Sequence, residues 1–109
     1  MVEHRRYKRA PVDLALEFVH PTTQERTVGR ATDMSIGGMF VQTTNPAAFG
    51  LQVTLTVTFP EERRPIELPA IVRWTRPGQG MGVQFGLLGA RETHAIMEAT
   101  HHATKVTGV

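Results

Sequence analysis

Two short polar motifs carry most of the chemistry that this sequence offers. The first lies near the start of the chain and contains Arg5, Arg6 and Arg9, and the second begins with Asp33 and continues to Ser35. An arginine guanidinium can pair bidentately with a phosphate or with the O6/N7 edge of guanine, and it can also stack on a base. An aspartate supplies the acceptor that the N–H groups of guanine require. Together, the motifs predict a site for a guanine-bearing, doubly phosphorylated ligand.

The second motif ends in two glycines, Gly37 and Gly38. Because Asp33 and Ser35 are two residues apart, both side chains leave an extended strand on the same face. The glycines permit a positive φ and a close approach of the backbone to a ligand. The alternative is an Asx-type turn in which Asp33 and Ser35 cap their own backbone and the glycines form the bend. The two roles are compatible, since a rigid turn can hold a binding site.

Short alternating segments, bounded by glycine and proline, predict a chain built mainly of strands. The clearest alternation runs over residues 51–59, where apolar side chains at odd positions alternate with Gln and Thr at even positions. Such a strand has one buried and one wet face. Without the spacing of βαβ units, the pattern predicts a mostly β fold, a small six-stranded antiparallel barrel with a C-terminal helix. The other expected elements are strands at 12–19, 25–32, 39–44, 66–76 and 81–85 and a helix at 90–104.

The length and composition of the chain fit a single domain over residues 1–109. We expect a mobile basic arm at 1–10, a barrel at 11–86 and a helix at 90–104. The absence of cysteine excludes disulfides and thiolate metal sites. No apolar run approaches the length of a membrane span, and no hydrophobic stretch follows the basic start. A cytoplasmic protein without stable membrane insertion is therefore expected.

The order and spacing of the two motifs resemble the PilZ domain family, the bacterial receptor module for cyclic di-GMP. The family pattern is Arg-x-x-x-Arg followed by Asp/Asn-x-Ser-x-x-Gly. The segments 70–74 and 80–85 look like the late hairpin of the family, and the sequence departs from it at His4, where many members carry a further arginine. The matching residues are Arg5, Arg9, Asp33, Ser35 and Gly38.

The resemblance implies a ligand, cyclic di-GMP, and no cofactor or enzymatic activity. It also implies a protein partner in motility, pilus or regulatory machinery. Trp74, the only tryptophan, has two open interpretations. It can pack in the core, or it can border the guanines, as an aromatic near this position does in the family, and stack on a base beside Arg76.

The arm from His4 to Arg9 holds four positive charges and no apolar pattern that would dock it on a barrel. We therefore expect it to be mobile in the free protein and to become ordered when a ligand is held by both the arm and the barrel. The output would be a composite surface of arm, ligand and barrel.

The histidines of the predicted helix invite a metal-site hypothesis that the sequence does not support. Metal sites with Glu-x-x-His spacing draw ligands from several facing helices, and only one helix is expected here. The residues concerned are His94, Glu98, His101 and His102. Catalysis is equally disfavoured, because Ser35 has neither a nucleophile elbow nor a recognisable base. The glycines at 78, 80 and 82 link two strands and do not open a helix, as a phosphate loop would.

Two further function classes remain beside the receptor. One is a PilZ-like adaptor that works through protein contacts, with weak or no nucleotide binding. The other is a basic barrel that binds nucleic acid through its arginine arm. The nucleic-acid class is disfavoured because Phe59 and Phe85 are expected in the core, which leaves few rings on which bases could stack.

Overall fold

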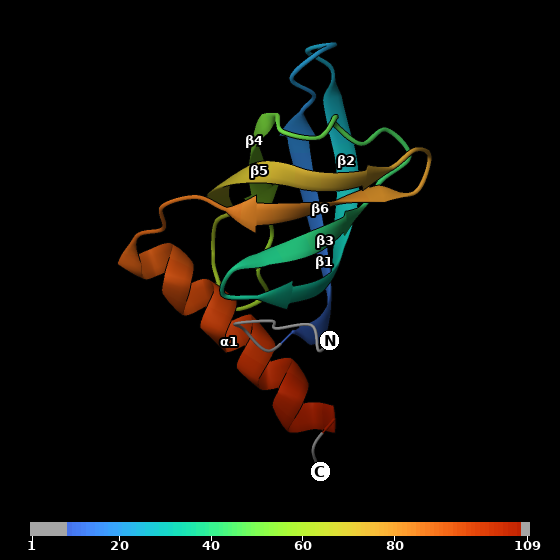
Figure 1. Cartoon of the computed structure of the whole chain (residues 1–109). Coiled ribbons are helices and arrows are strands. Elements are labelled where there is room, and N and C mark those ends of the chain that lie inside the picture. Colours follow the sequence, from blue (N-terminus) through green and yellow to red (C-terminus); the bar gives the residue numbers. More distant parts are fainter. Residues whose placement is uncertain (1–8, 108–109) are drawn as a thin grey trace.

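The computed structural model describes residues 9–107, with side chains described as far as residue 101. Six strands precede one helix along the chain (Figure 1). They are β1 (Ala10–Val19), β2 (Arg26–Ser35), β3 (Gly38–Gln42), β4 (Gln52–Val57), β5 (Ile66–Arg76), β6 (Gly80–Phe85) and α1 (Ala90–Thr107). The first strand begins at Ala10, whose buried side chain belongs to the barrel and not to the arm expected at 1–10.

The strands close into a barrel in the order β1-β2-β3-β6-β5-β4, and every neighbouring pair is antiparallel. The chain forms two three-stranded meanders, β1 to β3 and β4 to β6. They meet where β3 lies beside β6 and where β1 lies beside β4. The predicted fold class, a six-stranded antiparallel barrel followed by a helix, is confirmed.

Alternating side chains of the strands fill the interior of the barrel. In β4 and the residues after it, Val53, Leu55, Val57 and Phe59 are buried, whereas the side chains between them are exposed or half-buried. This is the pattern predicted for residues 51–59. Methionines fill much of the remaining space, because their unbranched chains adapt to irregular gaps; Met34, Met39 and Met81 are fully buried.

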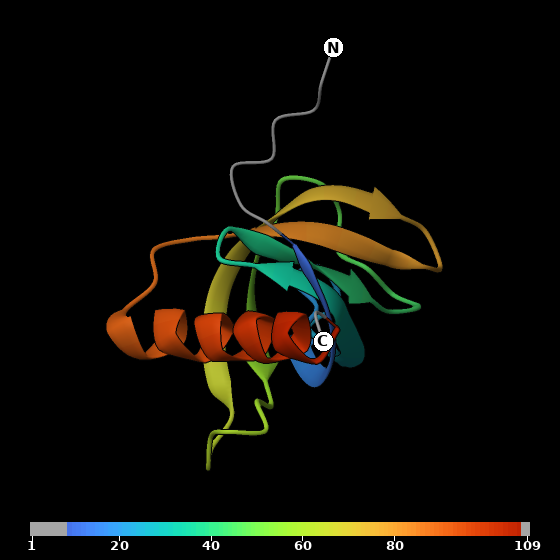
Figure 2. The same cartoon turned by 90° about the horizontal axis from the view of Figure 1, so that it is seen from below.

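The helix α1 covers one end of the barrel, as Figure 2 shows from below. Ala95 and Ile96 are buried against the core, and α1 contacts β1, β2 and β5. Arg91 of the helix forms an ion pair of 3.6 Å with Glu62, which lies between β4 and β5. No helix among the described residues is long and apolar enough to cross a membrane.

Three irregularities of register interrupt the ladders, and two of them set the direction of outward side chains. One lies between Ala31 and Asp33 in β2, and another between Val72 and Trp74 in β5. Each inserts an extra residue, as a β-bulge does. Regular alternation along residues 66–76 predicts that Val72 and Trp74 share one face of the strand. That prediction is wrong, because the bulge at Arg73 leaves Val72 in the core and turns Trp74 outward.

Candidate functional site

The two polar motifs meet directly on the outside of the barrel. β1 and β2 pair with Pro11 opposite Asp33, which brings the residue before β1 to the Asp33 carboxylate. Arg9 Nε donates to Asp33 Oδ1 at 2.8 Å, and the terminal guanidinium nitrogen donates to the same oxygen. Both side chains are partly exposed, so we assign this ion pair a modest worth of about 1 kcal/mol or less.

An aromatic platform, formed by Phe40 and Trp74, lies beside Asp33. Asp33 pairs with Phe40 across β2 and β3, and both Phe40 and Trp74 pair with Gly82 of β6. The rings stack with centroids 5.3 Å apart and planes 20° from parallel. Trp74 is 44% exposed. Of the two interpretations of Trp74, core packing is therefore wrong, and part of the residue is accessible at the surface of the barrel.

Glycines of β6 make room for the platform. A Cβ on Gly82 would lie 2.1 Å from Trp74 Nε1, and a Cβ on Gly80 would lie 2.5 Å from Phe40 Cζ. Sequence reasoning did not identify Phe40 as a site residue. The alternating glycines were a signal that could have found it, because a strand without outward side chains offers a flat surface on which rings from its neighbours can lie.

Arginines outside the two motifs also border the platform. Arg76 Cζ lies 5.2 Å from the centroid of the Trp74 ring, within the range of a cation–π contact. Arg30 lies on β2 and forms an ion pair of 2.6 Å with Asp13. Both arginines line a hollow of about 740 Å³ that Phe40 also borders. The surface beside the platform therefore offers cationic groups to an anion.

The remaining residues of the second motif build the turn between β2 and β3. Ser35 is buried, and its Oγ accepts a hydrogen bond of 3.1 Å from the Gly37 N–H. A Cβ on Gly38 would lie 2.1 Å from the carbonyl oxygen of Val83 in β6. The glycines of the motif do not adopt the positive φ that they permit: within residues 9–107, the glycines with positive φ are Gly50 and Gly78. The close backbone approach at Gly38 is to β6.

Two of the predicted site residues, Arg5 and Arg6, lie outside the described residues. So does the side chain of His102 in the histidine pattern of the helix, while His94 and His101 are exposed on α1. Within the part of the chain that the structure describes, no three His, Asp or Glu side chains are grouped so that they could hold a metal ion.

Chemically, the described site combines a carboxylate, a flat aromatic surface and several guanidinium groups on one outer face. The carboxylate can accept from N–H groups of a heteroaromatic base, the rings can stack on that base, and the arginines can neutralise phosphates.

Comparisons with known proteins agree with this geometry. The sequence model of the PilZ domain family matches residues 3–99. The fold resembles the PilZ domain of Escherichia coli YcgR, solved with c-di-GMP, with a TM-score of 0.72 and 14% identity over 97% of this chain and 98% of that one. A search of curated proteins found no match.

Two further solved structures are similar. The Bacillus subtilis inhibitor of motility MotI has a TM-score of 0.74 and 19% identity over 99% of this chain, which spans 54% of MotI. The PilZ domain of CeSA from a cellulose-synthesizing bacterium has a TM-score of 0.67 and 18% identity over 87% of this chain and 96% of that domain. At these identities the likeness concerns the fold.

The close approach at Gly38 predicts a structural role for this motif glycine. Gly38→Ala should lower the free energy of unfolding by at least about 2 kcal/mol, because the new methyl group meets the backbone of β6 and forces β3 away. Chemical denaturation followed by circular dichroism measures the change. Gly86→Ala is the matched control, since its Cβ would make an ordinary contact of 3.6 Å with Pro69. Equal stability of the two variants would contradict the assignment.

Proposed function

This chain belongs to the PilZ domain family, and we propose that it is a non-enzymatic receptor for cyclic di-GMP that passes ligand binding on to a protein partner. The observation that carries the proposal is the row formed by Asp33, Phe40 and Trp74 across β2, β3, β6 and β5. In this row a carboxylate, which is the kind of acceptor that the N–H groups of guanine require, lies beside the platform and supports the proposal. The YcgR domain, which shares the fold, was solved with c-di-GMP.

In this proposal a guanine of the ligand stacks on the platform at its exposed residue, Trp74. Base–aromatic stacking contributes about 1–3 kcal/mol per base. The carboxylate of Asp33 accepts from the N1–H and N2–H groups of a guanine, which adenine does not present in the same arrangement. Asp33 therefore selects the base, and the platform supplies affinity that is largely independent of the base.

The arginines hold the phosphates of the ligand. Arg9, Arg5 and Arg6 come from the arm, and Arg76 comes from the barrel. Because Arg9 is bonded to Asp33 in the free structure, binding exchanges partners: the guanidinium moves to a phosphate, and the carboxylate moves to a guanine. Both charged groups keep a charge-assisted hydrogen bond, so the exchange costs little free energy beyond the loss of the exposed ion pair.

The signal is the ordering of the arm over the ligand, which creates a surface for a partner in motility, pilus or regulatory machinery. A cytoplasmic location remains a prediction. One observation favours the alternative of an adaptor with weak or no nucleotide binding: Arg9 already satisfies Asp33, so a ligand has to displace it. Direct binding measurements distinguish the two functions.

Cyclic di-GMP should bind the purified chain with a dissociation constant in the micromolar range or tighter, equivalent to about 8 kcal/mol or more. Trp74→Ala should weaken binding by roughly 5- to 150-fold, because it removes one stacking surface. Calorimetric titration gives both affinity and stoichiometry.

Phe49→Ala is the control, because this ring is exposed but is not part of the platform. GTP and a single-stranded oligonucleotide, titrated in parallel, test the other ligand classes. No heat at ligand concentrations of hundreds of micromolar, at moderate salt, would favour the adaptor.

The two partners of the ion pair should have different effects on ligand choice. Arg9→Ala should weaken binding by about 10- to 100-fold, with a smaller loss at high salt, because it removes a charge-assisted phosphate contact. Asp33→Ala should lower the preference for cyclic di-GMP over cyclic di-AMP. Arg63→Ala, an exposed arginine between β4 and β5, controls for general charge. If Asp33→Ala weakens both dinucleotides equally, the aspartate shapes the turn and does not read the base.

Hydrogen exchange tests the proposed ordering of the arm. With cyclic di-GMP, amides of residues 3–8 should gain protection, because the ligand fastens their arginines to the barrel. The strand β4 should change little, since it already lies in the barrel. Equal protection of the arm with and without ligand would refute this switch, even if binding is observed.

A further inference from the structure

The barrel is closed unevenly, and its weakest junction lies between β1 and β4. β3 and β6 pair over all residues of β3, from Gly38 to Gln42. In contrast, β1 and β4 pair only where Leu16 is opposite Val57 and Glu17 is opposite Thr56. Continuing this register would place Val19 opposite Thr54, but the ladder has no pair there. We call this unpaired part of the junction the seam.

Backbone groups of both strands point into the seam. The Thr58 N–H donates to the Ala15 carbonyl at 2.9 Å. Because backbone groups alternate in direction along a strand, those of Thr56, Thr54 and Gln52 also face β1. By the same alternation, those of Val19 face β4. Among the described residues, the ladders give Thr54 and Val19 no partner across the seam. These groups are an exposed strand edge, which can pair with another chain.

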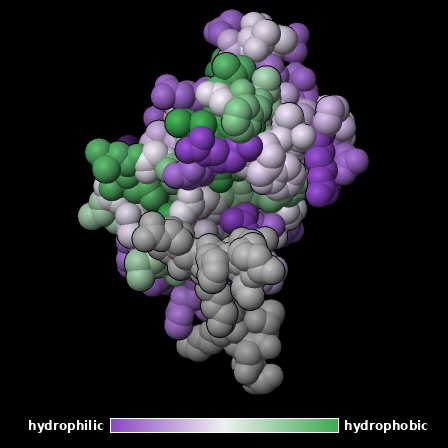
Figure 3. All heavy atoms as spheres, in the orientation of Figure 1, coloured by the Kyte–Doolittle hydropathy of each residue, from purple (hydrophilic) through white to green (hydrophobic). Residues whose placement is uncertain are grey.

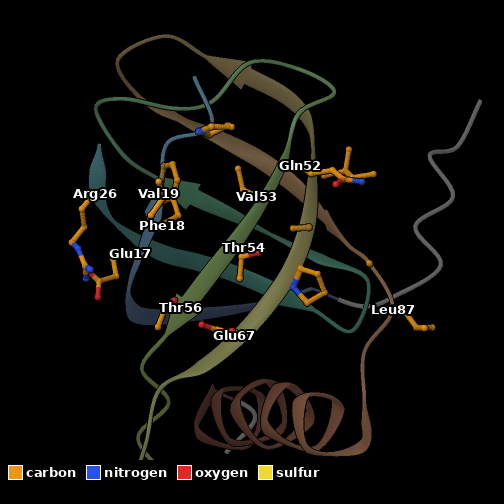
Figure 4. A pocket seen from close by; sticks show the side chains of 15 residues that line it. Glu17, Phe18, Val19, Arg26, Gln52, Val53, Thr54, Thr56, Glu67 and Leu87 are labelled. Carbon is orange, nitrogen blue, oxygen red and sulfur yellow. The ribbon is translucent and has the colours of Figure 1, made fainter. Parts of the chain in front are cut away.

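A groove of about 770 Å³ lies along β4, with residues of β1 on one side and residues of β5 and the β6–α1 connection on the other (Figure 4). Its lining includes the inward-facing Phe18 and Val53, so the groove reaches the edge of the core. Val19 lines it with an exposed apolar side chain at the seam, whereas Leu87, which is 96% exposed, lines it on the far side of β5. Figure 3 shows hydrophobic side chains gathered over the connection between β6 and α1, where Leu87 lies. Apolar surface left open beside a strand edge is typical of an interaction site.

The charges at the groove are not balanced. Glu17 and Arg26 form an ion pair of 3.0 Å. Glu67, on the neighbouring strand β5, lines the same groove and has no ion pair with a described residue. The groove therefore has one carboxylate available for a cation from outside.

We propose that the seam is a docking site for an extended segment of a protein partner. The segment adds as a strand to the edges of β1 and β4, covers Val19 with an apolar side chain, and directs a lysine or arginine to Glu67. The junction of β1 and β4 lies opposite β6, the strand over which the platform residues pair, since β6 is three strands from β1 and two from β4 in the closed order. The docking site does not depend on the proposed ligand.

A synthetic peptide tests this site on the whole chain. The probe is a fluorescein-labelled heptapeptide of alternating valine and threonine with a lysine at each end, followed by fluorescence anisotropy. We expect saturable binding with a dissociation constant on the order of 100 µM, and increased hydrogen-exchange protection at Thr54. Thr54→Pro should weaken binding at least about tenfold, because it removes the N–H that points into the seam. Thr54→Val keeps that N–H and should bind as the unmodified chain does.

A peptide control keeps the test independent of the folding of the proline variant. The same heptapeptide, N-methylated at alternate amides so that its edge donors are lost, should bind the unmodified chain at least about tenfold more weakly. Glu67→Gln should weaken binding of the original peptide about two- to fivefold.

Several outcomes would overturn the proposal. Absence of saturable binding at millimolar peptide would overturn it. Equal binding of the N-methylated and original peptides would also overturn it, because it would show that side chains alone are recognised. Analytical ultracentrifugation tests whether a second copy of the chain occupies the seam instead. That occupant would be indicated by a dimer that is absent in the Thr54→Pro variant and is not dissociated by the peptide.

Discussion

The close contact between β3 and β6 is the constraint on which the rest of the structure depends. It joins the two meanders along the whole of β3, and only a residue without a side chain can occupy position 38 against the Val83 carbonyl. The contact also fixes register. A slip of one residue would turn Phe40 into the core and a core methionine outward. The platform therefore exists because Gly38 lets β3 lie in this register.

The sequence predicted the parts of the site that follow from regular geometry and missed those that depend on irregularities. The alternation of residues 51–59 predicted one buried face, and the motif spacing predicted that Arg9 and Asp33 serve one site. The direction of Trp74 depends on the bulge at Arg73, and no simple period reveals an inserted residue. Phe40 was missed because the room for its ring comes from glycines on another strand. Only the pairing of β3 with β6 brings those glycines beneath Phe40.

The pairing of Arg9 with Asp33 changes the energetics expected for the site. Sequence reasoning gave the two groups separate ligand contacts, phosphate for the arginine and guanine for the aspartate, whereas the structure has them hydrogen-bonded to each other. A buried pair of this kind would impose a large penalty on binding, because each partner would be left with an uncompensated charge. Here both side chains are partly exposed, so water can solvate them during the exchange. The ion pair therefore orients the arginine and the carboxylate at a small cost in binding free energy.

The two junctions of the barrel suit different tasks. The continuous β3–β6 junction can hold a platform rigid, which stacking requires, whereas the short β1–β4 junction leaves an edge that another strand can use. A single element reaches both places: β1 begins next to Arg9 and ends at Val19 in the seam. If the ligand moves Arg9 from Asp33 to a phosphate, any shift of β1 is transmitted along a strand that pairs with β2 at Ala10 and Pro11 and again, after an irregularity, from Leu14 to Val19. By linkage, a segment bound in the seam would then change the affinity for the ligand by the same factor by which the ligand changes the affinity for the segment.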